Sequence, residues 1–263
     1  MQPMLNIAIR AARSAGDFIT RRVNKISDLK IETKAKNDFV SEVDRHAEER
    51  VIETILKAYP QHSILAEESG EINGDDEYRW IIDPLDGTTN FLHGFPHYAV
   101  SIACQCKGRI EHGVIYDPIK QELFTASRGD GATLNNRRIR VARLTTTEGA
   151  LLGTGFPCRR PQELDNYLKV FREFFVTVSD IRRTGSSALD LAYVAAGQLD
   201  CYWESGLRAW DIAAGALILR EAGGAITDFK GNADYLDNGE VVAANPKLLS
   251  DMLRKIQMHQ ENP

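Results

Sequence analysis

Apolar residues recur at intervals of three and four positions in several stretches of the chain, a spacing that predicts amphipathic helices. Pro60 ends the second of these stretches, and Gly197 closes a later one that begins after Ser186, a candidate N-cap residue. The predicted helices cover residues 4–19, 43–58, 164–175, 187–196 and 210–222.

Short apolar runs rich in β-branched and aromatic residues lie between these stretches and predict strands. Turn signals at 107–108 and 117–118 separate three of the runs, which favours an antiparallel meander. The segment 71–77 is polar, so we expect a loop there, and a second half of the chain begins near Leu144. The predicted strands cover residues 63–66, 80–83, 98–106, 109–116, 122–126, 149–155 and 199–204. Together the two patterns predict a mixed α/β (α+β) fold.

Residues 80–90 combine a strand with residues that carry chemistry. Their apolar start predicts a buried strand that breaks at Pro84 and Gly87, after which the sequence suits the start of a helix. Asp83 and Asp86 lie three positions apart, so a turn can aim both carboxylates at one point, where a cation would relieve their repulsion. Carboxylate oxygens are ligands that Mg²⁺ prefers.

The residues that follow suit an anion. The backbone N–H groups of Gly87, Thr88 and Thr89 would be free at a helix start and would bind a phosphate beside the metal. A metal next to a phosphate site indicates phosphoryl chemistry. A pair of aspartates in a solvated surface turn is the alternative that this short pattern leaves open.

Composition narrows the range of partners. A chain of 263 residues with 43% hydrophobic content can bury a large core, and its net charge of −5 gives no broad basic surface for nucleic acid. No apolar run approaches the roughly 18 residues that a membrane span needs. Residues 1–22 lack a continuous apolar core and a cleavage site, so we interpret them as mature structure. A soluble cytoplasmic protein is expected.

Four cysteines, at positions 104, 106, 158 and 201, are too few and too irregularly spaced for a disulfide framework. Cys104 and Cys106 would share one face of a strand, because side chains alternate along an extended backbone. We expect buried thiols and not a metal site.

Two longer strings carry a family resemblance. Asp83-Pro84-Leu85-Asp86-Gly87-Thr88-Thr89-Asn90-Phe91, followed by His93-Gly94, resembles the first signature of the inositol monophosphatase family. The string Trp210-Asp211-Ile212-Ala213-Ala214-Gly215-Ala216 is similar to its second signature, and the intervening segments also match in order and spacing. The resemblance implies one layered α-β-α-β-α domain over residues 1–263, formed from halves 1–143 and 144–263, and a homodimer.

The resemblance also implies a ligand set of two or three Mg²⁺ ions. Adjacent side chains on a strand face opposite ways, so Glu67 and Glu68 cannot both reach one metal, and the family pattern selects Glu67. A third, weaker ion near Glu67 is implied as well. The first ion would bind Glu67, Asp83 and the Leu85 carbonyl, and the second would bind Asp83, Asp86 and Asp211.

Further roles follow from the same resemblance. The segment 37–44 matches the family segment whose last aspartate, here Asp44, helps Thr88 to orient the attacking water. Glu67 would share in catalysis, and the Gly87 and Thr88 amides would bind phosphate. By position alone Asp44 is a helix-start charge, as Asp211 is. The alcohol would contact Asp86, Gly185, Ser187, Glu204 and Asp211, although animal members of the family tend to have alanine in place of Ser187.

Three functions are therefore expected in order. The first is Mg²⁺-dependent, lithium-sensitive hydrolysis of inositol monophosphates or similar sugar phosphates, which Glu204 favours over a bisphosphate. The second is hydrolysis of fructose bisphosphate or 3′-phosphoadenosine 5′-phosphate. That reaction needs cations for the extra phosphate or a base, and the arginines available are Arg182, Arg183 and Arg208.

The third function belongs to a different class. Residues 1–8 and 189–197 resemble a bacterial branch of the family that is associated with ribosomal RNA transcription antitermination as well as phosphatase activity. The resemblance implies RNA polymerase or antitermination factors as partners. Such binding would use surface residues and would survive the loss of catalysis.

Overall fold

Two large sheets and three layers of helices make up the protein. The structure, a computed structural model, describes residues 2–23, 31–35, 38–158 and 160–259. The described α-helices are α1 (Pro3–Arg22), α2 (Glu42–Ala58), α3 (Thr88–Leu92), α4 (Leu164–Phe175), α5 (Ser187–Ala196), α6 (Ala209–Glu221), α7 (Tyr235–Asn238) and α8 (Pro246–Gln257), and a 3₁₀ turn, η2 (Pro161–Glu163), precedes α4.

The strands form an eight-stranded sheet, a five-stranded sheet and a small hairpin. The hairpin pairs β1 (Ile31–Ala35) with β2 (Asp38–Ser41). The eight-stranded sheet has the order β10 (Arg137–Arg138), β9 (Gly131–Leu134), β8 (Glu122–Ser127), β7 (Arg109–Asp117), β6 (Ala99–Cys106), β5 (Asp75–Asp86), β3 (His62–Ala66), β4 (Gly70–Ile72). The five-stranded sheet has the order β12 (Asp180–Arg182), β11 (Leu151–Thr154), β13 (Cys201–Glu204), β15 (Val241–Ala244), β14 (Ala225–Thr227).

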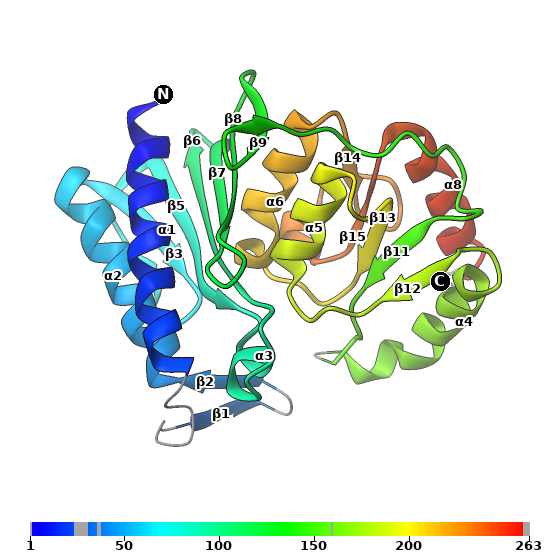
Figure 1. Cartoon of the computed structure of the whole chain (residues 1–263), viewed down its shortest axis with the longest axis horizontal. Coiled ribbons are helices and arrows are strands. Elements are labelled where there is room, and N and C mark those ends of the chain that lie inside the picture. The colour runs from blue at the N-terminus through cyan, green and yellow to red at the C-terminus, as the bar shows by residue number, and fades with distance from the viewer. Residues whose placement is uncertain (1, 24–30, 36–37, 159, 260–263) are drawn as a thin grey trace.

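The layers follow the order α-β-α-β-α that the family resemblance implies (Figure 1). Helices α1 and α2 cover the outer face of the eight-stranded sheet, and α4 and α8 cover the outer face of the five-stranded sheet. Helices α5 and α6 lie between the sheets. The sequence explains this placement, because α1 and α2 have a polar face whereas α5 and most of α6 are buried all round.

One prediction from the pattern is wrong, and several elements were missed. The segment 71–77 is not a loop, because it contains the end of β4 and the start of β5. Backbone pairing decides the outcome there, since Ile72 pairs with Ile64 of β3 although its neighbours are polar. Helix α8 near the C-terminus was not predicted. Among the described residues, no helix is long and apolar enough to cross a membrane.

The prediction of buried thiols holds for only part of the set. All four cysteines are free, Cys104 and Cys201 are buried, and Cys106 is half-buried. Cys158 is exposed, because the loop that follows β11 carries it to the mouth of a cavity. That cavity lies between the two sheets and contains most of the residues singled out above.

Candidate functional site

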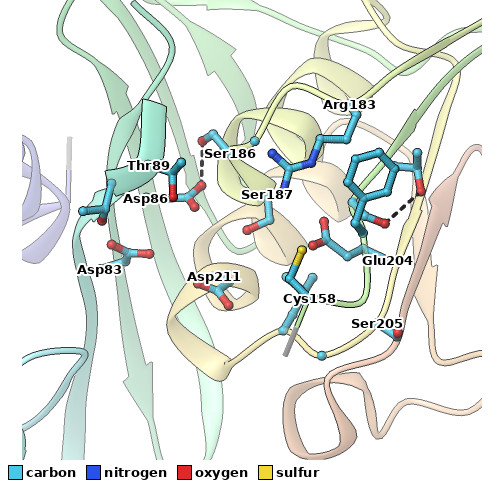
Figure 2. A pocket seen from close by; sticks show the side chains of 18 of the residues that line it. Asp83, Asp86, Thr89, Cys158, Arg183, Ser186, Ser187, Glu204, Ser205 and Asp211 are labelled. Carbon is cyan, nitrogen blue, oxygen red and sulfur yellow. Dashed lines mark hydrogen bonds between the residues drawn. The ribbon is translucent and has the colours of Figure 1, made fainter. Parts of the chain in front are cut away.

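A cavity of about 390 Å³ opens between the end of β5 and the five-stranded sheet (Figure 2). Both halves of the chain contribute to its wall. The predicted site residues that line it are Glu67, Asp83, Leu85, Asp86, Gly87, Thr88, Gly185, Ser187, Glu204 and Asp211. The wall also contains Thr89, Thr154, Gly155, Phe156, Cys158, Arg183, Ser186, Ser205, Gly206 and Leu207. Of the predicted site residues, Asp44 alone lies behind this wall.

A β-bulge brings the two carboxylates of the first motif together. Side chains three positions apart on a regular strand point to opposite faces. In β5, however, Asp83 pairs with Ser101 and Asp86 with Ala99, so three steps on β5 match two on β6. The extra residue lies at Pro84–Leu85, where a proline is tolerated, and it turns Asp86 to the same side as Asp83.

Asp83, Asp86 and Asp211 form a compact acidic cluster, which we call the carboxylate cluster. One carboxylate oxygen from each lies within 4.8 Å of the others. Asp211 reaches the cluster from the first turn of α6, where its Oδ2 accepts a hydrogen bond of 2.7 Å from the Arg208 N–H. As whole residues, the three are between 1% and 9% exposed.

Electrostatics indicates that this cluster fits a cation. Burial raises the pKa of Asp83 well above its ordinary value, and the negative charges of Glu67, Asp86 and Asp211 raise it further. The Leu85 N–H donates a hydrogen bond of 2.9 Å to Asp83 Oδ1, which opposes the shift only in part. A buried set of hard oxygen donors that repel one another is the donor set that suits a divalent cation.

Asp86 also joins the two halves of the chain. Its Oδ2 accepts hydrogen bonds from the Ser186 hydroxyl (2.6 Å) and from the Ala188 N–H (2.7 Å), about a hundred residues along the chain. Ser186 caps α5, because its Oγ accepts a long bond of 3.4 Å from the Leu189 N–H. The predicted N-cap is thereby confirmed. Ser186 also holds Asp86 through the hydrogen bond from its hydroxyl, which the local pattern does not reveal.

Behind the cavity wall, Asp44 holds Thr88. The Thr88 hydroxyl lies 2.9 Å from Asp44 Oδ1 and 3.0 Å from the Leu85 carbonyl oxygen. The Ser41 N–H and hydroxyl donate to Asp44 Oδ2 at 2.8 and 2.6 Å. Burial raises the pKa of Asp44, and the Ser41 bonds oppose that rise. Asp44 therefore acts on the cavity through Thr88 and not directly.

Glu67 lies in the turn after β3, and a residue missed by the sequence analysis fixes that turn. Glu48 on α2 is 3% exposed, and its two carboxylate oxygens accept hydrogen bonds of 2.8 Å from the Glu68 and Ser69 N–H groups. A signal for Glu48 was available, since it follows Asp44 by one helical turn on the buried face of α2.

The far end of the cavity is built around Glu204. The Tyr202 hydroxyl donates a hydrogen bond to Glu204 Oε2. Burial raises the pKa of Glu204 to about 7, against the lowering effects of Tyr202 and Arg183. Gly155 was also missed, because only packing reveals it. A Cβ there would lie 1.9 to 2.1 Å from the Glu204 carboxylate atoms, so any side chain displaces that group.

Three arginines are candidates to bind the second anionic group of a bisphosphate substrate. Arg183 lines the cavity, where Cζ lies 5.2 Å from the centre of the Phe156 ring. Arg182 is exposed and pairs with Asp180 at 2.5 Å. Arg182 and Arg208 are not part of the described wall, so Arg183 is its single cation, opposite five carboxylates.

Comparison with known proteins agrees with this geometry. The model of the Inositol monophosphatase family matches residues 1–261. A curated relative from Pseudomonas aeruginosa, named Nus factor SuhB, is 55% identical over 98% of this chain and 97% of its own length.

Solved structures agree as well. The extragenic suppressor protein SuhB of Bartonella henselae superposes with a TM-score of 0.95 at 44% identity, covering 97% of this chain and 99% of that one. An inositol monophosphatase from Anabaena (Nostoc) gives a TM-score of 0.86 at 39% identity, covering 97% and 95%. The chain is therefore a phosphatase-type member of the inositol monophosphatase family.

Proposed function

We propose that the protein is a Mg²⁺-dependent, cytoplasmic phosphatase that hydrolyses inositol 1-phosphate or a similar polyol monophosphate. The observation that carries the proposal is one cavity with two unlike ends. At one end is the carboxylate cluster with Thr88 beside it, and at the other is Glu204, a hydrogen-bond acceptor for hydroxyl groups.

The donor set supports the metal assignment. Glu67, Asp83 and the Leu85 carbonyl would hold one Mg²⁺, and the carboxylate cluster would hold a second. A weaker third ion near Glu67 is part of the same proposal. Bound metal of this kind lowers the pKa of water and stabilises the leaving oxygen of a phosphate ester. Lithium sensitivity is part of the same proposal.

The residues around the metal positions would place the reactants. The Thr88 hydroxyl, held by Asp44, would orient the attacking water, and Glu67, which lines the same cavity, would assist. The backbone N–H groups of Gly87 and Thr88 would bind phosphate oxygens, where negative charge grows in the transition state. In this scheme no residue becomes phosphorylated.

The alcohol would lie toward the five-stranded sheet. Asp86, Glu204 and Asp211 would accept hydrogen bonds from its hydroxyl groups, and Gly185 and Ser187 would line the same space. A bisphosphate suits this end less well, because Glu204 carries the wrong charge for a second phosphate.

Phosphate release from inositol 1-phosphate tests the proposal. We expect purified protein to turn over the substrate only with Mg²⁺, and an Asp83→Asn variant to lose that turnover while remaining folded. Absence of turnover by folded, Mg²⁺-replete protein with inositol 1-phosphate, and with a panel that adds fructose bisphosphate and 3′-phosphoadenosine 5′-phosphate, would contradict it.

A second function is supported by the name of the Pseudomonas relative, a Nus factor. We propose that this chain also binds RNA polymerase or antitermination factors through its surface, and that this binding does not require catalysis. A folded Asp83→Asn variant should then still be retained by a transcription complex in a pull-down. Loss of both activities together would argue against separate functions.

A homodimer is proposed as the working form. Leu168, Phe175 and Val176 are between 50% and 74% exposed on and after α4, and such apolar exposure suits a partner surface. Light scattering should give twice the chain mass of 29.4 kDa. A mass of 29.4 kDa at working concentrations would contradict this assignment.

A further inference from the structure

A second cavity, of about 530 Å³, lies at the other end of strands β5 and β6 from the carboxylate cluster. The start of α1 and the neighbouring ends of β5, β6 and β7 enclose it (Figure 1). Its wall contains a set of soft donor atoms, namely two thiols, one thioether and one imidazole. These groups belong to Met4, Cys104, Cys106 and His112.

Strand register puts the donor groups on one face of the sheet. Cys104 and Cys106 are two positions apart on β6, so their side chains point to the same side. His112 of β7 pairs directly with Cys104, and paired residues of an antiparallel ladder share a face. Met4 reaches this face from α1, where its Sδ lies 3.8 Å from Cys104 Sγ. The fold therefore gathers three sulfur atoms and an imidazole ring in one place.

The distance between the two sulfur atoms in contact suits a shared metal ion. The Cys104 thiol donates a weak hydrogen bond to the Met4 sulfur. If each sulfur lay ~2.3 Å from one ion, the separation of 3.8 Å would give an angle of about 110° at that ion, close to the tetrahedral value. An ion can therefore replace the thiol proton with little movement of either side chain.

His112 is oriented for a similar role. Its Nδ1 lies 2.8 Å from the Ser127 hydroxyl, a contact that fixes the ring and makes Nε2 the candidate nitrogen for a metal. Histidine ligands in metal sites are usually held in this way through their second nitrogen.

The donor types decide which ion fits. Thiolate and thioether sulfur prefer soft ions, whereas Mg²⁺ prefers oxygen, and thioether sulfur is not among the usual ligands of Zn²⁺. Exchange of one thiol proton for a monovalent ion leaves the net charge unchanged, which matters beside Cys104 because that residue is 1% exposed. The charged residues of the described wall are Lys107, Arg109, Glu111 and Arg128, three cations and one acid, so this wall disfavours a hard dication.

We propose that this cavity is a Cu⁺-binding site in which Met4 and Cys104 are the central ligands and Cys106 and His112 complete the set. Binding breaks the Cys104 S–H bond, forms a Cu–S bond and releases one proton to solvent. The ion binds as Cu⁺, so its oxidation state does not change. The site does not depend on the proposed phosphatase function, because the carboxylate cluster lies at the other end of β5 and offers oxygen donors.

Anaerobic titration of the full chain with Cu⁺ tests the site. Bicinchoninate, a coloured Cu⁺ chelator, reports how much of the ion the protein retains, and excess Mg²⁺ keeps the carboxylate cluster filled. We expect one strongly held Cu⁺ per chain and a higher thermal midpoint, because the ion ties α1 to β6. X-ray absorption of the loaded protein should show sulfur at ~2.3 Å, the length of a metal–thiolate bond.

Matched variants locate the ion. Met4→Leu and Cys104→Val remove sulfur but keep most of the side-chain volume, and each should weaken Cu⁺ binding at least about tenfold. Cys158→Ser removes the exposed thiol of the catalytic cavity and should leave the tight site unchanged. Met4 is half-buried at the start of α1, so Met4→Leu tests the site even if Cys104→Val does not fold.

Four results would overturn the proposal. Loss of all retained Cu⁺ to bicinchoninate would show that no tight site exists. Loss of binding in Cys158→Ser alone, or unchanged binding in folded Met4→Leu and Cys104→Val, would place the ion elsewhere. Displacement of Cu⁺ by an equimolar amount of Zn²⁺ would contradict the choice of ion.

Discussion

The two ends of the cavity are built in different ways. The carboxylate cluster is buried, and backbone N–H groups at the bulge of β5 and at the starts of α5 and α6 hold its members. The other end consists of Arg183, Phe156 and Cys158, which are exposed loop residues, around the buried Glu204. The first end therefore provides fixed geometry for chemistry, and the second provides a surface on which specificity can change without disturbing that geometry.

The largest effect is expected at the fixed end. Asp83→Asn should lower phosphate release by at least about a thousandfold, because the residue shared by both metal positions is lost. The same change removes a buried, repelled carboxylate, so the thermal midpoint in chelator should rise. A phosphate-release assay checks the first part, and scanning calorimetry with and without Mg²⁺ checks the second. A midpoint that falls in chelator would show that Asp83 stabilises the metal-free fold.

Asp44→Asn should have the next largest effect, since Asp44 holds Thr88 beside the carboxylate cluster. We expect kcat to fall about tenfold to a hundredfold with little change in KM, because Thr88 loses the group that orients its hydroxyl. Steady-state kinetics of the variant checks this. A change confined to KM would assign Asp44 to substrate binding.

At the adaptable end, Gly155→Ala should displace the Glu204 carboxylate from its place. The ratio of kcat/KM for inositol 1-phosphate to that for p-nitrophenyl phosphate should fall about tenfold, the size of one lost hydrogen bond to a charged group. Gly129→Ala, at an open surface turn, controls for the general cost of losing a glycine. If the two variants gave the same kcat/KM ratio, Gly155 would have no role in substrate specificity.

A smaller effect is expected from pH. Burial raises the pKa of Glu204 from 4.5 to about 7, so the carboxylate becomes protonated in the folded protein as the pH falls through about 7. The neutral acid accepts hydrogen bonds less well, and KM for inositol 1-phosphate should rise several-fold between pH 8 and pH 6. KM of the Glu204→Gln variant, measured at the same pH values, shows how much of the rise comes from titration of the substrate itself. An equal rise in that variant would exclude Glu204 as the cause.

The smallest effect is expected from Cys158→Ser, which should stay within about twofold of wild-type activity, because no described contact depends on the thiol. N-ethylmaleimide should inhibit the wild type by filling part of the cavity, and the serine variant should resist. Equal inhibition of both proteins would place the sensitive thiol elsewhere.

The contrast between the ends also explains what the sequence could predict. The aspartates of the cluster belong to strings with strong local patterns. Hydrophobic spacing and short apolar runs predict helices α1, α2, α4, α5 and α6 and seven of the described strands, but not α8 or the strands β14 and β15. The bulge at Pro84–Leu85 depends on the register of β5 against β6. Gly155 depends on where Glu204 lies, and Arg183 on the Phe156 ring. The bulge and Gly155 are set by packing or by partners that are distant in sequence, so no local pattern identifies them. The sequence names Arg183 only as one of three candidate cations and does not distinguish it from Arg182 and Arg208.

The hydrogen bonds from Ser186 and Ala188 to Asp86 have a consequence for folding kinetics. They join positions 100 and 102 residues apart, so they can form only after the central helices have docked on the eight-stranded sheet. Contacts of such long sequence separation form slowly, because the chain loses the entropy of a large loop before they stabilise it. In a refolding experiment, therefore, activity should return after secondary structure. The rate at which activity returns should report the docking of the two halves.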